Sequence, residues 1–116
     1  MHELGIAAEI QKIVTEALEK NAITTRVILI RLDIGEMRQL VPDALEFCFA
    51  GITKGSQLEG AQFEITTISL SGTCEGCGTA AVVNEPPFIC PECGSRKLKI
   101  EKGFELAVKS FEVADD

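Results

Sequence analysis

The 116-residue chain has no tryptophan and no tyrosine, and only six phenylalanines. A core built from this sequence must therefore be aliphatic, with isoleucine, leucine, valine and alanine around a few aromatic rings. Histidine is almost as scarce, because His2 is the only one. A chain with one imidazole nearly excludes a catalytic triad, and no nucleophile–base pair is recognisable. We therefore do not expect an enzyme.

Long apolar runs are also missing. No stretch approaches the roughly 20 apolar residues that a membrane-spanning helix needs, and no basic segment followed by an apolar run marks a signal peptide. Positive charge is in deficit, with 11 Lys and Arg against 18 Asp and Glu and a net charge of −7. An acidic chain repels phosphate groups, so neither nucleic acid nor an anionic membrane is an expected partner. These features predict a soluble, cytoplasmic protein.

Hydrophobic periodicity predicts the first three elements of the chain. Apolar residues at a 3.6-residue spacing predict an amphipathic helix from Leu4 to Asn21, with residues 1–3 as a short free end before it. Alternating β-branched residues predict a strand over Arg26–Gly35. Pro42 suits the first turn of a second, phenylalanine-rich helix that Gly55 would end.

Two further strands are expected at residues 62–71 and 104–113, and in both the apolar phase changes partway. Such a change indicates a bulge or a new packing partner. Since the two strands share it and flank the cysteine segment, we expect them to be antiparallel neighbours. The predicted fold is α+β: two helices on a three-stranded sheet, with an inserted four-cysteine module that resembles a zinc ribbon. Residues 1–71 and 102–116 would form one domain and residues 72–101 the other.

Four cysteines carry the strongest motif. Cys74 and Cys77 are two residues apart, as are Cys90 and Cys93, and a glycine follows each pair. Such turns place two thiolates at one edge of a tetrahedron, and the glycine lets backbone amides turn towards sulfur. Two facing turns make the four-thiolate geometry of structural zinc. A short strand at AAVV and a rigid return at Glu85–Phe88 would join them.

Other uses of these cysteines are weaker hypotheses. Disulfides do not suit the expected compartment, an iron site of rubredoxin type would be wrapped in aromatic residues, and a redox motif needs only one CxxC. A site saturated by four thiolates has no open coordination position, so it would hold shape and do no chemistry. The fifth cysteine, Cys48, is interpreted as a small buried apolar side chain. Four basic residues follow the motif and would offset the negative charge of the site: Arg96, Lys97, Lys99 and Lys102.

The single histidine lies where it could join a second metal site. A free amine at Met1, the amides of His2 and Glu3, and the His2 imidazole offer nitrogens in fused chelate rings that lie nearly in a plane. Such donors suit Ni(II) or Cu(II), whereas Zn(II) prefers a tetrahedron. The carboxylate of Glu3 would lie outside the ligand set or contact a delivery partner. An equally good interpretation is an acid favoured by the helix dipole.

Together these features resemble one known family. The MHE start, the amphipathic helix, a strand ending in Ile34-Gly35-Glu36, the phenylalanine-rich helix and CxxC-x12-CxxC resemble the HypA family of hydrogenase-maturation nickel metallochaperones. The resemblance covers nearly the whole chain.

The resemblance implies a function and a set of sites. It implies that residues 1–3 bind Ni(II) as cargo and that Cys74, Cys77, Cys90 and Cys93 hold a structural Zn(II). It also implies a nickel-handling GTPase and the NiFe-hydrogenase large subunit as partners, and urease maturation proteins for some members. The family has an acidic residue soon after the IGE stretch, where this chain has Val41. Asp43 and Glu36 are therefore only weak candidates for a further nickel ligand.

A competing hypothesis is a zinc-ribbon adaptor in transcription or RNA processing that binds no nickel. It predicts nucleic-acid binding that weakens steeply with salt, which the acidic charge disfavours. A purely structural adaptor predicts that His2→Ala changes nothing. Because the zinc segment interrupts the sheet, a change at the zinc site could also alter the nickel site.

Overall fold

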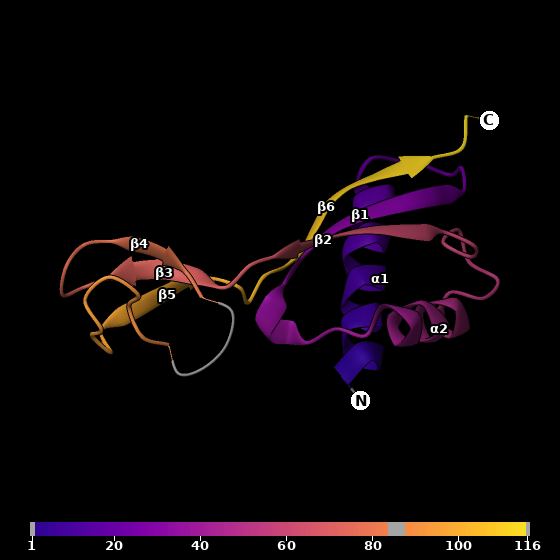
Figure 1. The fold of residues 1–116 in the computed structure, drawn as a ribbon. Helices are drawn as coiled ribbons and strands as arrows, with labels where there is room; N and C mark the ends of the chain where they lie inside the picture. The colour runs from indigo at the N-terminus through magenta and orange to yellow at the C-terminus, as the bar shows by residue number, and fades with distance from the viewer. Residues whose placement is uncertain (1, 84–87, 116) are drawn as a thin grey trace. The chain divides into compact units, whose positions relative to one another are not determined.

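The computed structural model describes residues 2–83 and 88–115. By its internal contacts the chain forms two compact units (Figure 1). The first contains Met1–Asp33, Leu40–Thr66 and Ala107–Asp116, and the second contains Ile34–Gln39 and Thr67–Leu106. The chain thus passes between the units four times. The domain limits expected from the sequence stay a prediction, and most of the expected return at 85–88 lies outside the described residues.

Helix α1 spans His2–Lys20 and supplies one wall of the core of the first unit. Its buried residues recur at the helical spacing: Ile6, Ala7, Ile10, Val14 and Leu18. Ile13, expected on the same face, is 38% exposed at the edge of this stripe. An apolar stripe of this kind is the burial pattern of a helix that packs on one side only.

The start of α1 corrects one prediction. The sequence predicts a free end at residues 1–3, but the helix already includes His2 and Glu3. Like any helix, this longer α1 leaves its first amides without intrahelical acceptors, which water or a side chain can satisfy. An acid in that turn, Glu3, is also favoured by the helix dipole.

The first sheet has the strand order β2-β1-β6, which corrects a second prediction. Strand β2 is Gln62–Ile68, β1 is Val27–Gly35 and β6 is Leu106–Val113. The expected neighbours β2 and β6 are thus separated by β1. The shared change of apolar phase misled the pairing because a sequence pattern reports the buried face of a strand and not its partner.

Strand β6 runs antiparallel to β1. The Gly35 amide donates to the Glu105 carbonyl at 2.8 Å, and the Ala114 amide donates to the Arg26 carbonyl at 2.8 Å. Within the first unit, Ile30 and Leu32 of β1 are buried, while Arg31 between them faces the other side of the sheet and is only partly covered. This alternation predicts that the helices pack on the face of Ile30 and Leu32.

Helix α2 spans Pro42–Ile52 and packs against α1. Pro42 lies in its first turn, as expected. The helix ends at Ile52 with Thr53 as its C-cap, and Gly55, with φ of +80°, lies in the turn that follows. Leu45 and Phe49 are buried on one face of α2.

The second unit contains a separate sheet of order β4-β3-β5. Strand β3 is Ser71–Cys74, β4 is Ala80–Val82 and β5 is Leu98–Lys102, and both neighbours are antiparallel to β3. The strand expected at 62–71 therefore divides, and the change of apolar phase marks a new packing partner. β4 confirms the short strand expected at AAVV, whereas β5 was not predicted because its lysines mask the pattern.

A short 3-10 helix, η1 (Glu36–Arg38), belongs to the second unit. The Met37 amide donates to the Gly103 carbonyl at 2.8 Å, and Arg38 Nε donates to the Phe104 carbonyl at 2.9 Å. The Glu36 carboxylate accepts the Leu70 amide at 3.3 Å. Segments far apart in the sequence are thus joined into one unit.

Candidate metal centres

The four predicted cysteines come together in the second unit. Cys74 ends β3 and Cys77 lies in the turn that follows it, while Cys90 and Cys93 begin and end the second turn. All four sulfurs lie within 4.8 Å of one another. The Cys74 and Cys93 sulfurs are 3.6 Å apart, as are those of Cys77 and Cys90. Zinc–sulfur bonds of about 2.3 Å in a tetrahedron require sulfurs roughly 3.8 Å apart, so the cluster fits zinc.

Backbone hydrogen bonds shape the two turns that hold these sulfurs. The Gly78 amide donates to the Cys74 carbonyl at 2.8 Å, and the Gly94 amide donates to the Cys90 carbonyl at 2.9 Å. These two glycines have φ of +77° and +73°, which side chains other than hydrogen rarely allow. The Gly76 amide points at the Cys74 sulfur at 3.3 Å, as the spacing predicted.

The four thiols differ in acidity because their surroundings differ. Hydrogen bonding from the side chain and then the amide of Thr79 lowers the pKa of Cys77 to about 6. The backbone amides of Cys77 and Gly76 lower the pKa of Cys74. The Ser95 amide also favours the Cys93 thiolate, but the neighbouring sulfurs and desolvation outweigh it and raise the pKa of Cys93 to about 12. Crowded thiols without a cation cannot all ionise, which is the situation that a bound Zn(II) would relieve.

The surroundings of the cluster match a structural role. Cys74 and Cys90 are buried and pack with Leu98, while Cys77 and Cys93 face solvent. Four thiolates fill the tetrahedron, so the site offers no open position for substrate. The basic side chains that follow the motif are exposed, and their compensation of its charge stays a prediction.

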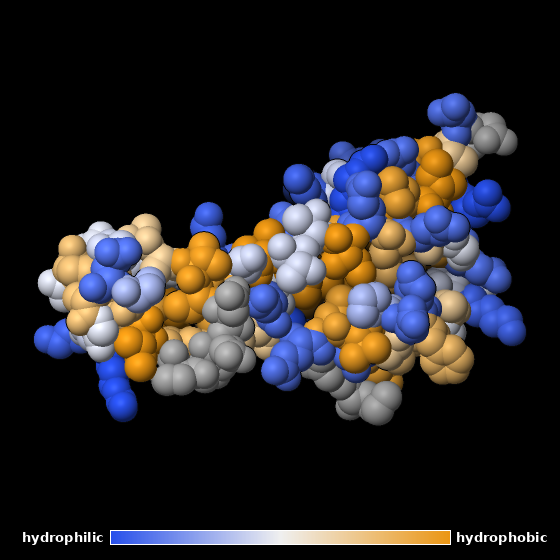
Figure 2. All heavy atoms as spheres, in the orientation of Figure 1, coloured by the Kyte–Doolittle hydropathy of each residue, from blue (hydrophilic) through white to orange (hydrophobic). Residues whose placement is uncertain are grey.

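Cys48 is the fifth cysteine and lies in the middle of α2. It is half-buried, less covered than the sequence suggested. It lines a shallow groove of about 750 Å³ together with Leu4 and Phe47. Leu4 is 43% and Phe47 82% exposed, and Figure 2 shows hydrophobic residues reaching the surface on the drawn face of the molecule.

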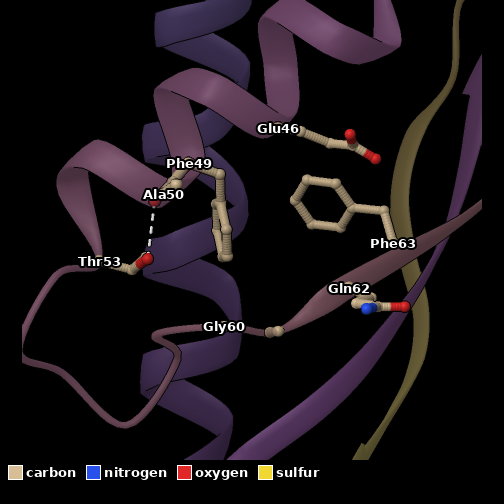
Figure 3. A pocket seen from close by; sticks show the side chains of 8 residues that line it. Glu46, Phe49, Ala50, Thr53, Gly60, Gln62 and Phe63 are labelled. Atoms are coloured by element: carbon tan, nitrogen blue, oxygen red, sulfur yellow. Dashed lines mark hydrogen bonds between the residues drawn. The ribbon is translucent and has the colours of Figure 1, made fainter.

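A second hollow lies between α2 and β2 (Figure 3). It measures about 430 Å³, and the rings of Phe49 and Phe63 meet in it with centroids 4.8 Å apart. Glu46 contributes a carboxylate at its rim, while the Thr53 hydroxyl already donates to the Phe49 carbonyl at 2.7 Å. Glu46 is the one ionisable side chain among the residues that line this hollow, so the lining offers no pair of groups for acid–base or nucleophilic chemistry.

The predicted nickel-binding tip is described in part. Met1 lies outside the described residues, His2 is the first residue of α1, and Glu3 follows in the first turn. The Glu3 carboxylate accepts a hydrogen bond from the Val41 amide at 3.2 Å. Sequence reasoning missed this contact, because 38 positions separate the partners and no periodicity connects them.

The two weak ligand candidates lie in different settings. Asp43 is exposed in the first turn of α2. Glu36 belongs to the second unit, where its carboxylate accepts the Leu70 amide. Among the described residues, no hydrogen bond joins Asp43 or Glu36 to Glu3. The structure therefore adds no support for either residue as a nickel ligand.

No helix in the part of the chain that the structure describes is long and apolar enough to cross a membrane.

Comparison with known proteins gives a consistent result. The family described as "Hydrogenase/urease nickel incorporation, metallochaperone, hypA" matches residues 1–113. Hydrogenase maturation factor HypA of Desulfatibacillum aliphaticivorans is 38% identical over 115 residues, covering 99% of this chain and 88% of the relative. HypA of Trichodesmium erythraeum is 42% identical over 115 residues, covering 99% and 97%.

Solved structures support the fold. The solution structure of the nickel metallochaperone HypA from Helicobacter pylori matches with a TM-score of 0.68 at 19% identity, over 100% of both chains. A second solution structure of a HypA protein matches with a TM-score of 0.72 at 20% identity, over 100% of this chain and 98% of the other. At this identity the likeness concerns the fold alone.

Proposed function

Because this chain belongs to the HypA family of hydrogenase and urease nickel-incorporation metallochaperones, we propose that it binds Ni(II) at the start of α1 and passes it on during hydrogenase maturation. Nickel is then its cargo, and zinc is a structural ion for the four cysteines. The observation that carries this proposal is the match of residues 1–113 to the family, together with the only histidine of the chain at position 2.

The proposed ligands are the Met1 amine, the amides of His2 and Glu3, and the His2 imidazole. The first amides of any helix lack intrahelical acceptors, so metal binding at His2 and Glu3 would break no hydrogen bond of the helix ladder. Ni(II) accepts nitrogen donors of this kind. Deprotonated amides would also place negative charge at the positive end of the helix dipole, which favours them.

The proposed partners follow from the role. A carrier must give its ion to an acceptor, and we propose that the acceptor is the NiFe-hydrogenase large subunit. We propose a nickel-handling GTPase as a second partner protein, with transfer taking place in the cytoplasm. Urease maturation proteins are proposed as further partners. Neither nucleic acid nor membrane is included, because the chain carries a net charge of −7.

The decisive test is a Ni(II) titration of three proteins with zinc in place. These are the chain with a free Met1 amine, the same chain with a short N-terminal extension, and His2→Ala. The extension turns the amine into an amide, and the substitution removes the imidazole. We expect both to weaken nickel binding by more than the roughly 10- to 100-fold that loss of a group outside the ligand shell costs.

The zinc content of all three proteins is the control and should stay the same, since Cys74, Cys77, Cys90 and Cys93 are untouched. Equal nickel affinity in the three proteins would contradict the proposed site. A second check is pH: a free imidazole and an α-amine titrate near 6.5 and 7.7–8.0, so nickel affinity should fall between about pH 8 and 6.

A further inference from the structure

The Glu3 carboxylate connects two elements of the first unit. It accepts the Val41 amide at 3.2 Å, and Val41 is the residue that caps the start of α2. The Val41 backbone is extended, with φ of −102° and ψ of 105°, and its carbonyl accepts the Leu45 amide at 3.0 Å. The Val41 amide therefore lies outside the helix ladder and is available to a side chain.

The first turn of α1 has few other attachments. Buried residues begin only at Ile6, whereas Leu4 is 43% exposed and Gly5 is exposed with nothing within 4 Å of the place where its Cβ would be. Glycine also lowers the tendency of this turn to stay helical. Among the described residues, the hydrogen bond from Val41 is the side-chain hydrogen bond that joins this turn to another element.

We infer that Glu3 is a positioning residue: its carboxylate holds the first turn of α1 to the Val41 amide and so pre-arranges the backbone nitrogens of His2 and Glu3 for nickel. The inference rests on the proposed nickel site. Ordering a binding segment in advance reduces the entropy lost on binding, so affinity rises without any new metal contact. In this role the carboxylate binds the backbone and does not bind the metal.

This role differs from that of a ligand in what a glutamine can replace. A glutamine side chain has the same length and keeps an oxygen that accepts from an amide, although a neutral acceptor is weaker. If Glu3 acts through Val41, Glu3→Gln retains most of the effect and Glu3→Ala loses it. If the negative charge or a metal–oxygen bond matters, both substitutions fail alike.

The experiment compares the zinc-loaded wild-type chain with Glu3→Ala, Glu3→Gln and the control Glu9→Ala. Glu9 lies on the same helix and is exposed. Without nickel, the Val41 amide is followed by its NMR chemical shift and hydrogen-exchange rate. Nickel affinity is then measured by titration. Melting temperatures show that all four proteins are folded.

In Glu3→Ala we expect the Val41 amide signal to move and its exchange to accelerate, and nickel affinity to fall about three- to tenfold, the usual range for loss of one hydrogen bond. Glu3→Gln should stay within about twofold of wild type, because its amide oxygen still accepts, and Glu9→Ala should change neither quantity.

Three results would overturn the inference. An unchanged chemical shift and exchange rate of the Val41 amide in Glu3→Ala would remove the structural basis of the inference, whether or not nickel affinity changes. A moved amide with unchanged nickel affinity removes the positioning role, and equal losses in Glu3→Ala and Glu3→Gln favour charge or direct ligation. Undiminished nickel binding in His2→Ala would instead refute the proposed function, and the role of Glu3 towards nickel with it.

Discussion

At the scale of single residues, Gly35 and Gly103 are two positions where a side chain would clash with the chain itself. A Cβ on Gly35 would lie 2.2 Å from the Gly103 carbonyl carbon and oxygen. Gly103 has φ of +123°, and a Cβ there would lie 2.6 Å from Leu70 Cδ1. Gly35 itself has φ of −66°, so close packing and not backbone conformation is the reason for glycine at that position.

Gly35→Ala should therefore destabilise the protein, because backbone atoms of Gly103 must shift to admit a methyl group. Overpacking of this kind costs about 1–3 kcal/mol. The matched control is Gly51→Ala in α2, where nothing lies within 4 Å of the Cβ position and alanine should stabilise the helix by about 0.5–1 kcal/mol. Urea unfolding midpoints measure both, and a neutral Gly35→Ala would contradict the predicted clash.

The unequal acidity of the cysteines predicts unequal reactivity once zinc has been removed. With a pKa of about 6, Cys77 is roughly nine-tenths thiolate at pH 7, whereas Cys93, with a pKa of about 12, is protonated. Iodoacetamide should modify Cys77 first although both side chains are exposed. Mass spectrometry of timed samples measures the order. Thr79→Val should slow the modification of Cys77. Equal modification rates for Cys77 and Cys93 in the wild-type chain would refute the prediction.

The same shift sets the sign of a pH effect on the metal-free protein. The pKa of Cys77 falls from 9.0 in the unfolded chain to about 6, so the folded state binds fewer protons between these values. Stability from this thiolate is fully present above about pH 9 and is lost as the pH falls through 6. Acid should therefore weaken this turn of the zinc-free form.

At the scale of elements, Arg31 joins all three strands of the first sheet. From β1 its guanidinium makes an ion pair with Glu64 of β2 at 2.8 Å and another with Glu112 of β6. Its side chain is 35% exposed, so solvent screens both pairs. The arrangement links the strands across the face that the helices leave uncovered.

Arg31→Met should lower stability only slightly and should reduce the dependence of stability on salt, because exposed ion pairs are screened by ions. Urea midpoints at low and high salt measure this. Arg26→Met is the control, since Arg26 is exposed and makes no ion pair within the described part of the chain. A salt dependence that Arg31→Met leaves intact would show that the pairs contribute nothing.

Periodicity predicted the long elements well and the short ones poorly. α1, β1 and α2 each bury a face that repeats at the period of its structure, so their sequences identify them. β5 packs on β3 through little more than Leu98 and the half-buried Ile100, and its lysines and glutamate face solvent. Strand order also escaped prediction, because it depends on the paths of connections and not on any one strand.

At the scale of the whole molecule, the two units differ in what keeps them folded. The first has an extensive aliphatic core on α1, β1 and α2. The cluster around the second sheet consists of Cys74, Cys90 and Leu98 with a few partly buried neighbours. Burying one aliphatic side chain contributes about 1.5–3 kcal/mol, whereas structural zinc in small peptides supplies roughly 10–16 kcal/mol. Metal binding should therefore contribute more to the stability of the second unit than its small apolar cluster does.

Removal of zinc with a strong chelator should lower the hydrogen-exchange protection of β3, β4 and β5 much more than that of α1 and β1. The second sheet would lose its main source of stability, while the first keeps its core. Exchange measured by mass spectrometry or NMR separates the two sheets. Cys74→Ala removes one zinc ligand and should cause the same pattern of lost hydrogen-exchange protection as the chelator. Simultaneous loss of protection in α1 would show that the units unfold together.

The two candidate sites were open to sequence reasoning to different degrees. The cysteine cluster was predictable because two CxxC pairs with following glycines fix local turns, and four sulfurs at a tetrahedral spacing need little else. The nickel-binding role of residues 1–3 was predicted from the chemistry of their nitrogens alone, and it stays a proposal. The contact between Glu3 and Val41 was missed because it depends on how α1 and α2 pack, which no local pattern encodes.

The four passages of the chain between the units have an evolutionary consequence. A gene segment encoding residues 67–106 could not be transplanted as a self-contained cassette, because Ile34–Gln39 would stay behind. The Leu70 amide would then lose Glu36, and the Gly103 carbonyl would lose Met37. Recombination that shuffles modules at single breakpoints would damage both halves, so the two must be inherited together.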